Sequence, residues 1–284
     1  MNILTHSAAC ENIFSHTLGG HVVTHEIHKP FQSVETINPD GVGPALILCE
    51  HASNHIPPEF GELGLIPDAL NSHAAWDPGA RAVALGLSVA LNAPLVAGCV
   101  SRLVYDCNRP PEADTAIPAR SEIFDVPGNT NLTVAEKMCR IETVYDPFCT
   151  AVENVIAARQ VAGRQTVLIT IHSFTPVYFE EHRDVEIGIL HDRDSRLADA
   201  MLDMSHRLPH RRIDRNQPYG PDDGVTHSLK LHGISNALPN VMIEIRNDLL
   251  TSEVREVAMA SELLELIAPA LSTLGLTGEG EDHA

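Results

Sequence analysis

The stretch QTVLITIHSF, residues 165–174, decides the fold because it joins the clearest strand of the chain to a histidine. Residues 166–171 are apolar and β-branched without interruption, which is typical of a strand buried on both faces of a parallel sheet. Shorter apolar runs occur at 45–49 (ALILC) and 240–245 (NVMIEI). All three runs are followed or interrupted by residues that bind metals or carry protons.

Between these runs the pattern alternates. Further strands are expected at 94–100, 103–105 and 186–190, and helices at 79–91, 133–162, 195–207 and 252–271. Pro147 should break or kink the second helix. Alternating strands and helices of this length predict an α/β fold with three layers: a mostly parallel central sheet and helices on both faces.

The chain is expected to form one main domain, residues 44–275. Residues 1–43 are polar and rich in turns, and predict an extension that packs on this body. Residues 276–284 are small and acidic, which predicts a disordered tail.

The formal net charge of −19 argues against a nucleic-acid surface, which needs clustered Lys and Arg. No apolar stretch approaches the roughly 18 residues of a membrane helix. The N-terminal MNILTHSAACENIF has no basic start followed by an apolar core, so a cytoplasmic protein is expected. If the small-molecule substrate is an anion, the site must gather positive charge locally, from a few arginines or a metal; the oligomeric state stays open.

Histidines at the strand ends predict a catalytic metal site. In parallel sheets, ligands bind at the carboxyl ends of the strands, where His51 and His172 are placed. Zinc in enzymes takes about three His or carboxylate ligands, and another divalent ion would be possible. Asp77 is the preferred third ligand, although it could equally cap the helix that follows. Asn54 and His55 are the alternatives.

Charged residues near these ends suggest further roles. Glu244, inside an apolar strand, could be a general base or form a buried ion pair with Arg246. Arg102 could stabilise a developing oxyanion, and Arg109 could anchor a substrate carboxylate. The alternative is that Asp106 forms a structural ion pair with one of these two arginines.

Familiar catalytic motifs are absent from the chain. There is no G-x-S-x-G elbow, no G-x-x-x-x-G-K-[ST] loop and no dinucleotide-binding G-x-G-x-x-G after a strand. Tyr219 lies in a turn-rich loop that could close over the site.

Six motifs, in order, resemble the N-formylglutamate amidohydrolase family: CEHASNHIP, WDPGA, SRLVYDCNRP, IHSFTPVY, NQPYGPDDG and IEIRNDL. The resemblance spans roughly residues 45 to 250. It implies a phosphorylase/hydrolase-like fold, similar to zinc carboxypeptidases and aspartoacylases. The implied activity is zinc-dependent hydrolysis of an N-acyl acidic amino acid, with N-formyl-L-glutamate giving formate and glutamate.

The resemblance also implies roles for individual residues. Asn108 and Arg109 look like the pair that holds a substrate carboxylate, and Glu244 and Arg246 look like a Glu-Leu-Arg stretch whose Glu is the base. Tyr219 is similar in place to a tyrosine that closes over substrate. The carboxypeptidase H-x-x-E motif is missing, which leaves Asp77 as the carboxylate ligand.

Two other functions remain open from the sequence. One is a related deacylase or carboxypeptidase-like hydrolase that acts on another N-acyl amino acid or a peptide. The other is a non-catalytic protein that binds an anionic small molecule.

Overall fold

The computed structural model describes residues 31–276 of the chain. Most of the expected N-terminal extension (residues 1–30) and most of the expected tail (residues 277–284) lie outside the described residues. Leu276, placed in the tail by the sequence, is buried and packs against the core, so the folded body extends at least to this residue.

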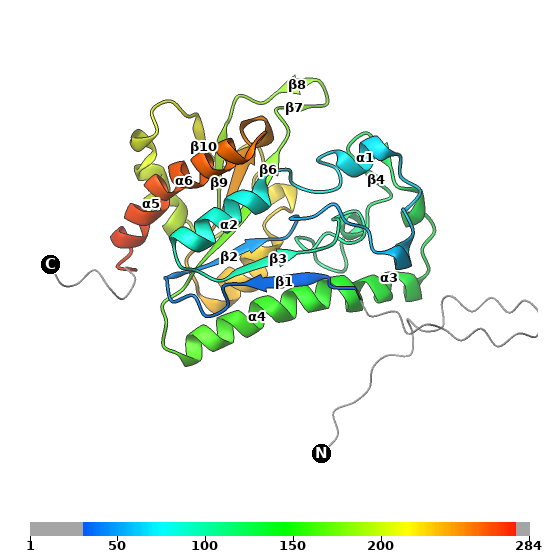
Figure 1. The fold of residues 1–284 in the computed structure, drawn as a ribbon, viewed down its shortest axis with the longest axis horizontal. Helices are drawn as coiled ribbons and strands as arrows, with labels where there is room; N and C mark the ends of the chain where they lie inside the picture. The colour runs from blue at the N-terminus through cyan, green and yellow to red at the C-terminus, as the bar shows by residue number, and fades with distance from the viewer. Residues whose placement is uncertain (1–30, 277–284) are drawn as a thin grey trace, which may run out of the picture.

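A mostly parallel sheet of seven strands forms the centre of the molecule, in the order β1-β3-β2-β6-β11-β9-β10 (Figure 1). The β1–β3 and β11–β9 pairs are antiparallel, and the other neighbours are parallel. The strands are β1 (Val34–Ile37), β2 (Ala45–Cys49), β3 (Leu95–Gly98), β6 (Val167–Phe174), β9 (Ile187–Leu190), β10 (Ile213–Arg215) and β11 (Asn240–Arg246).

Helices cover both faces of the sheet, which confirms the α/β expectation. Helices α2, α5 and α6 share one core with the sheet, and α4 shares the other (Figure 1). The helices are α1 (Pro67–Asn71), α2 (Ala80–Ala90), α3 (Val134–Arg140), α4 (Asp146–Val161), α5 (Arg196–Asp203) and α6 (Glu253–Thr273). Two small hairpins complete the fold: β4 (Arg120–Ser121) with β5 (Phe124–Asp125), and β7 (Val177–Tyr178) with β8 (Glu181–His182).

The uninterrupted apolar runs are explained by this layering. In β2, Ala45, Ile47 and Cys49 belong to the core under α2 and α6, whereas Leu46 and Leu48 belong to the core under α4. Successive side chains of a strand point to opposite faces, so a strand with a core on each face has a nearly continuous apolar sequence.

The strand expected at 103–105 is wrong. Leu103, Val104 and Tyr105 are buried, but they lie in a turn rather than in the sheet. Their carbonyl groups find side-chain donors instead: Asn129 donates to Leu103 O at 2.8 Å and Arg140 donates to Val104 O at 3.0 Å. Buried backbone must be paired, and here side chains replace a strand partner.

Pro147 does not break the chain of helices. It occupies the first turn of α4, where its missing N–H is tolerated. A π-helical segment, Ile141–Tyr145, connects α3 to α4 and ends two residues before the proline. The wider turn accommodates a residue that cannot donate a hydrogen bond.

Two edge strands were not expected from the sequence. β1 lies inside the expected extension and pairs with β3, and β10 is a three-residue strand that pairs with β9 at the other edge.

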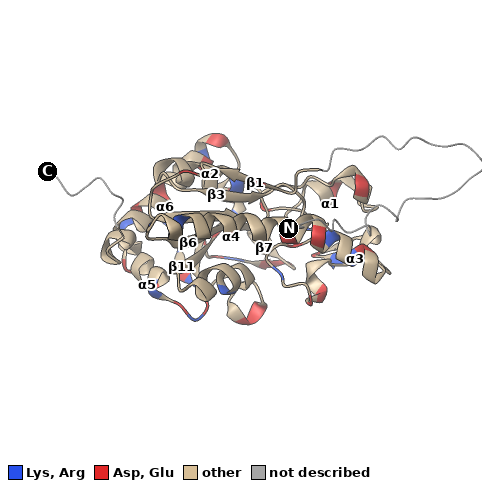
Figure 2. Ribbon diagram, turned by 90° about the horizontal axis from the view of Figure 1, so that it is seen from below, with Lys and Arg blue, Asp and Glu red and all other residues tan. Residues whose placement is uncertain are grey.

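Among the described residues, no helix has the length and apolar character needed to cross a membrane. Figure 2 shows Lys and Arg interspersed with Asp and Glu along the elements in that view.

Candidate active site

Parallel strand ends bring distant residues to one edge of the sheet. β6 is the partner of both β2 and β11, and His172 on β6 lies directly opposite Glu244 on β11. His51 follows the end of β2 by two residues. The main chain therefore delivers all three side chains to the same edge.

Asp77 reaches this edge from the loop before α2. The backbone N–H of Asp77 donates to His51 O at 3.0 Å, which ties the loop to the end of β2. The N-cap of α2 is Gly79, which has a φ of 80° and makes no side-chain capping bond. A Cβ at Gly79 would lie 2.4 Å from the Cβ of Leu250, so the turn requires glycine. The alternative that Asp77 caps this helix is wrong, and its carboxylate is free to face the histidines.

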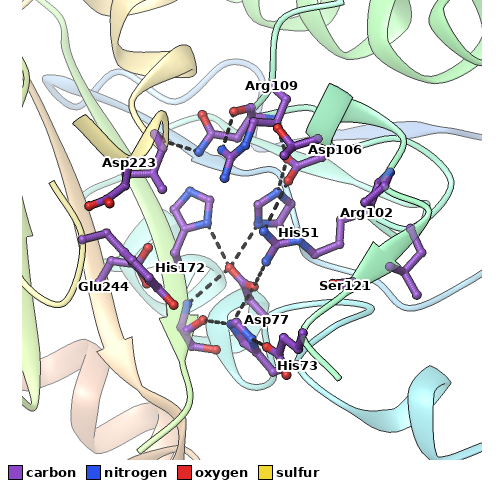
Figure 3. A pocket seen from close by; sticks show the side chains of 18 of the residues that line it. His51, His73, Asp77, Arg102, Asp106, Arg109, Ser121, His172, Asp223 and Glu244 are labelled. Carbon is purple, nitrogen blue, oxygen red and sulfur yellow. Dashed lines mark hydrogen bonds and ion pairs between the residues drawn. The ribbon is translucent and has the colours of Figure 1, made fainter. Parts of the chain in front are cut away.

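His51, Asp77 and His172 form a compact buried cluster (Figure 3). Asp77 Oδ2 lies 3.3 Å from His51 Nδ1 and 2.9 Å from His172 Nδ1. The two rings meet edge to face, with centroids 5.0 Å apart. One ligand atom from each residue lies within 4.8 Å of the others, so the three residues make a possible metal-binding site. Two imidazoles and a carboxylate are a donor set that zinc accepts.

A buried carboxylate lies behind each imidazole. Asp106 Oδ1 is 2.7 Å from His51 Nε2, and Glu50 Oε2 is 3.2 Å from His172 Nε2. Both rings thus turn Nδ1 toward Asp77 and Nε2 toward an outer carboxylate. Such outer carboxylates orient histidine ligands and make them better donors.

The pKa values of the cluster show how strongly its charges interact. Burial raises the pKa of Asp77, but His51, His172 and Arg102 outweigh burial and hold it well below its usual value. Burial lowers the pKa of His172, but Glu50 and Asp77 outweigh it and raise that pKa well above the usual value. A cation and its carboxylate neighbours each favour the charged form of the other.

Arg102 bridges two of these carboxylates. Its guanidinium donates to Asp77 Oδ1 at 3.0 Å and to Asp106 Oδ2 at 3.3 Å. Burial lowers the pKa of Arg102, but Asp106 and Asp77 raise it above its usual value. The alternative that Asp106 forms an ion pair with one of the two arginines is therefore present in the structure, and the arginine is Arg102.

Glu244 lies beside the cluster with spare hydrogen-bonding capacity. Only 6% of the residue is exposed, and its Oε2 has no hydrogen-bond partner among the described residues. Burial raises the pKa of Glu244 and outweighs the opposing effect of His172. An unpaired buried carboxylate is costly, which points to a functional reason for its presence.

Arg246 does not take part in this site. Its guanidinium donates to Asp248 Oδ1 at 2.8 Å and to Arg183 O at 3.0 Å, and the residue does not line the cavity. The expected ion pair between Arg246 and Glu244 is wrong, because Arg246 turns to the loop after β11. Substrate contact by Arg246 is not supported by this position.

The cluster opens into a cavity of about 410 Å³, large enough for a small ligand. Arg102, Asn108, Arg109, Tyr219 and Glu244 line it together with the three residues of the cluster.

The alternative metal ligands, Asn54 and His55, lie elsewhere. Asn54 donates to Leu70 O at 2.9 Å, His55 is exposed, and neither lines the cavity.

The residues predicted to bind substrate differ in how many hydrogen-bond and ion-pair partners they already have within the protein. Asn108 Nδ2 donates to Val225 O at 2.6 Å and its Oδ1 accepts from Ser228 N at 3.0 Å, so its amide holds a loop. Arg109 donates to Asn108 O at 2.8 Å and forms no ion pair with a described residue within 4.0 Å. Burial raises the pKa of Tyr219 to about 12, which keeps its hydroxyl protonated.

Three nearby residues were not predicted as site residues. Glu50 was adjacent to His51 in the sequence, and Asp106 was weighed only as an ion-pair partner. His73 lies four residues before Asp77; its Nε2 is 2.6 Å from Ser173 O and its Nδ1 is 2.6 Å from Glu122 Oε1. Each had a sequence signal that could have drawn attention to it: Glu50 adjoins His51, Asp106 lies between Arg102 and Arg109, and His73 begins the run HAAWD.

Comparison with known proteins relates this arrangement to a family. The sequence model of the N-formylglutamate amidohydrolase family matches residues 43–251. The crystal structure of a gene product from Agrobacterium tumefaciens is 54% identical, with a TM-score of 0.85, and the match covers 87% of this chain and 97% of that one. An N-formylglutamate amidohydrolase from Ralstonia eutropha is 19% identical with a TM-score of 0.59, covers 85% and 97%, and shares the fold. No curated protein matches the chain significantly. The match over most of its length shows that the chain belongs to the N-formylglutamate amidohydrolase family.

Proposed function

We propose that the protein is a zinc-dependent amidohydrolase that splits N-formyl-L-glutamate into formate and glutamate. Family membership supports amidohydrolase chemistry. The observation that carries the metal requirement is the cluster of His51, Asp77 and His172, whose ligand atoms lie within 4.8 Å of one another beside the cavity.

The donor set fits a divalent metal. Both imidazoles present Nδ1 to Asp77 Oδ2, and each Nε2 lies within ion-pair distance of a buried carboxylate. When bound there, zinc or another divalent ion would polarise the scissile carbonyl and make a water more acidic.

Glu244 is the proposed general base. It lines the cavity opposite His172 on the neighbouring strand, and one of its oxygens has no other partner among the described residues. The raised pKa of Glu244 makes it a better proton acceptor than an ordinary carboxylate. Glu244 would take a proton from the attacking water and return it to the nitrogen of the leaving amino acid.

The arginines divide two tasks. Arg102 neutralises Asp77 and Asp106, and its charge at the cavity wall would stabilise the negative charge that develops on the carbonyl oxygen. Arg109 has no carboxylate in ion-pair contact among the described residues, so its guanidinium is available for the α-carboxylate of the substrate. Asn108 would position Arg109 and the loop at 225–228, and Tyr219 would contact the bound substrate from the cavity wall.

The test combines metal analysis with a substitution. The purified protein should contain about one zinc or other divalent ion per chain and hydrolyse N-formyl-L-glutamate. Glu244→Gln should lower kcat at least about 100-fold with the metal content unchanged. Glu265→Gln, on the exposed face of α6, is the matched control and should behave like the wild type.

Other results would redirect the assignment. Full activity after exhaustive removal of metal would refute the metal requirement. Turnover of another N-acyl amino acid or a peptide, but not of N-formyl-L-glutamate, would identify a related deacylase. Tight binding of an anionic amino acid without turnover of any substrate would identify a binding protein.

A further inference from the structure

A further arginine, Arg183, packs against aromatic side chains beside the cavity. Arg183 follows the β7–β8 hairpin, and its guanidinium carbon lies 4.4 Å from the ring centre of Tyr178, 4.8 Å from that of Tyr219 and 5.6 Å from that of Phe174. Tyr178 and Tyr219 both line the cavity. The charge of Arg183 is therefore held against the cavity wall by two rings that a ligand would touch.

Arg183 has no ion pair with any described residue within 4.0 Å; its guanidinium donates a long hydrogen bond, 3.5 Å, to Thr175 O and interacts with the hydroxyl of Tyr219. Arg120, also at the cavity, pairs with Asp125 at 3.2 Å, and Arg102 pairs with two carboxylates. A guanidinium without a carboxylate partner is unexpected in a chain with 38 acidic and 19 basic residues. Stacking on aromatic faces fixes the plane of a guanidinium and leaves its N–H edge free for a carboxylate.

We propose that Arg183 is a specificity-determining residue that binds a second, side-chain carboxylate of the substrate. The inference rests on the proposed function, in which Arg109 binds the α-carboxylate. Arg109, which lines the cavity, and Arg183, which contacts two tyrosines that line it, have no carboxylate within ion-pair distance among the described residues. Two such cations match an N-acyl amino acid that carries two carboxylates.

The uncharged relatives of this substrate class provide the test. N-formyl-L-glutamate and N-formyl-L-glutamine have the same shape and differ by one charge. The full-length wild-type protein should favour the glutamate compound in kcat/KM. Arg183→Gln should lower kcat/KM for N-formyl-L-glutamate about 10- to 100-fold and leave N-formyl-L-glutamine within about threefold, as expected for one lost charge-assisted pair.

Two controls separate recognition from other effects. Arg212→Gln removes the same charge from an exposed arginine that pairs with Asp184 and Asp214, and should leave the substrate ratio unchanged. Arg183→Lys keeps the charge but loses the planar fork, and should fall between the wild type and Arg183→Gln. Binding of L-glutamate and L-glutamine, measured by calorimetry, reports the same preference without any turnover.

The outcomes keep this inference distinct from the proposed function. Preference for L-glutamate that disappears in Arg183→Gln supports the inference even if no formyl compound is hydrolysed. Equal losses for both substrates would mean that Arg183 only holds the hairpin, and would overturn it. A wild-type protein without preference for the dicarboxylate, or an Arg183→Gln variant with unchanged preference, would overturn it as well.

Discussion

The carboxylate behind His172 offers a sharp test of the proposed metal site. Glu50→Gln keeps the shape of the side chain and removes its charge. The Glu50 side chain is 0% exposed, and its Oε2 lies 3.2 Å from His172 Nε2. We expect the variant to bind zinc about 10- to 100-fold more weakly than the wild type at alkaline pH, because the imidazole loses the partner that orients it.

The magnitude follows from the distance. Two unit charges 3.2 Å apart attract by about 5 kcal/mol at an effective dielectric constant of about 20. Burial of Glu50 opposes this attraction, since burial raises the pKa of the carboxyl before His172 lowers it below its usual value. Loss of the carboxylate partner of a metal-binding histidine typically weakens metal binding about 10- to 100-fold, which corresponds to about 1.4–2.7 kcal/mol.

The assay is a titration of metal-free protein with zinc against a competing chelator. Glu50 also raises the pKa of His172, so in the wild type a proton competes with the metal for the ring. This competition is weaker in Glu50→Gln, and the deficit in affinity should therefore shrink as the pH falls from about 8.5 to about 6.5. Glu35→Gln is the control. Glu35 lies on the edge strand β1, away from the site, and is paired at 2.6 Å with Arg81 of α2.

A clear result would refute this reasoning. If Glu50→Gln has wild-type circular dichroism and wild-type zinc affinity across this pH range, Glu50 does not support a metal-binding imidazole. An equal loss in Glu35→Gln would show that the effect is not specific to the site.

Three further outcomes are expected. Leu168→Ala, at a position that is 0% exposed on the central strand β6, should lower the free energy of unfolding by about 3 kcal/mol in a urea titration. Arg102→Gln leaves Asp77 and Asp106 without their guanidinium, so the metal-free protein should lose about 3 kcal/mol, and thermal melting should show a larger stabilisation by zinc than in the wild type. Burial lowers the pKa of His232 to about 4. Its unfolded value is about 6.5, so the unfolded chain binds a proton that the folded chain refuses, and stability is lost as the pH falls from about 6.5 to about 4. Urea titrations at about pH 6.5 and about pH 4 should show that His232→Gln loses about 3 kcal/mol less unfolding free energy between the two pH values than the wild type. An equal loss in the two proteins would contradict the lowered pKa of His232.

Much of the fold was determined by the sequence alone. The apolar runs at 45–49, 166–171 and 240–245 became β2, β6 and β11, because a strand with a core on both faces is predominantly apolar along its length. The same logic placed His51 and His172 at one edge of the sheet. Parallel strands end on the same side, so neighbouring positions follow from the pattern.

Tertiary structure decided the contacts that local pattern does not encode. The apolar segment at 103–105 is buried as a turn because Asn129 and Arg140, from other parts of the chain, satisfy its carbonyl groups. The apolar pattern of the segment indicates that it is buried, but it does not indicate which side chains donate to its carbonyl groups.

The same limit applies to the site. Asp77 faces the histidines because Gly79 takes over the start of α2, whereas Arg246 turns away toward Asp248. Glu50 meets His172, and Arg183 meets Tyr219, although the two residues of each pair are distant in sequence. Sequence determined which residue types arrive at the sheet edge, and only the folded chain decided which partner each side chain meets, because charge pairing depends on distances in space.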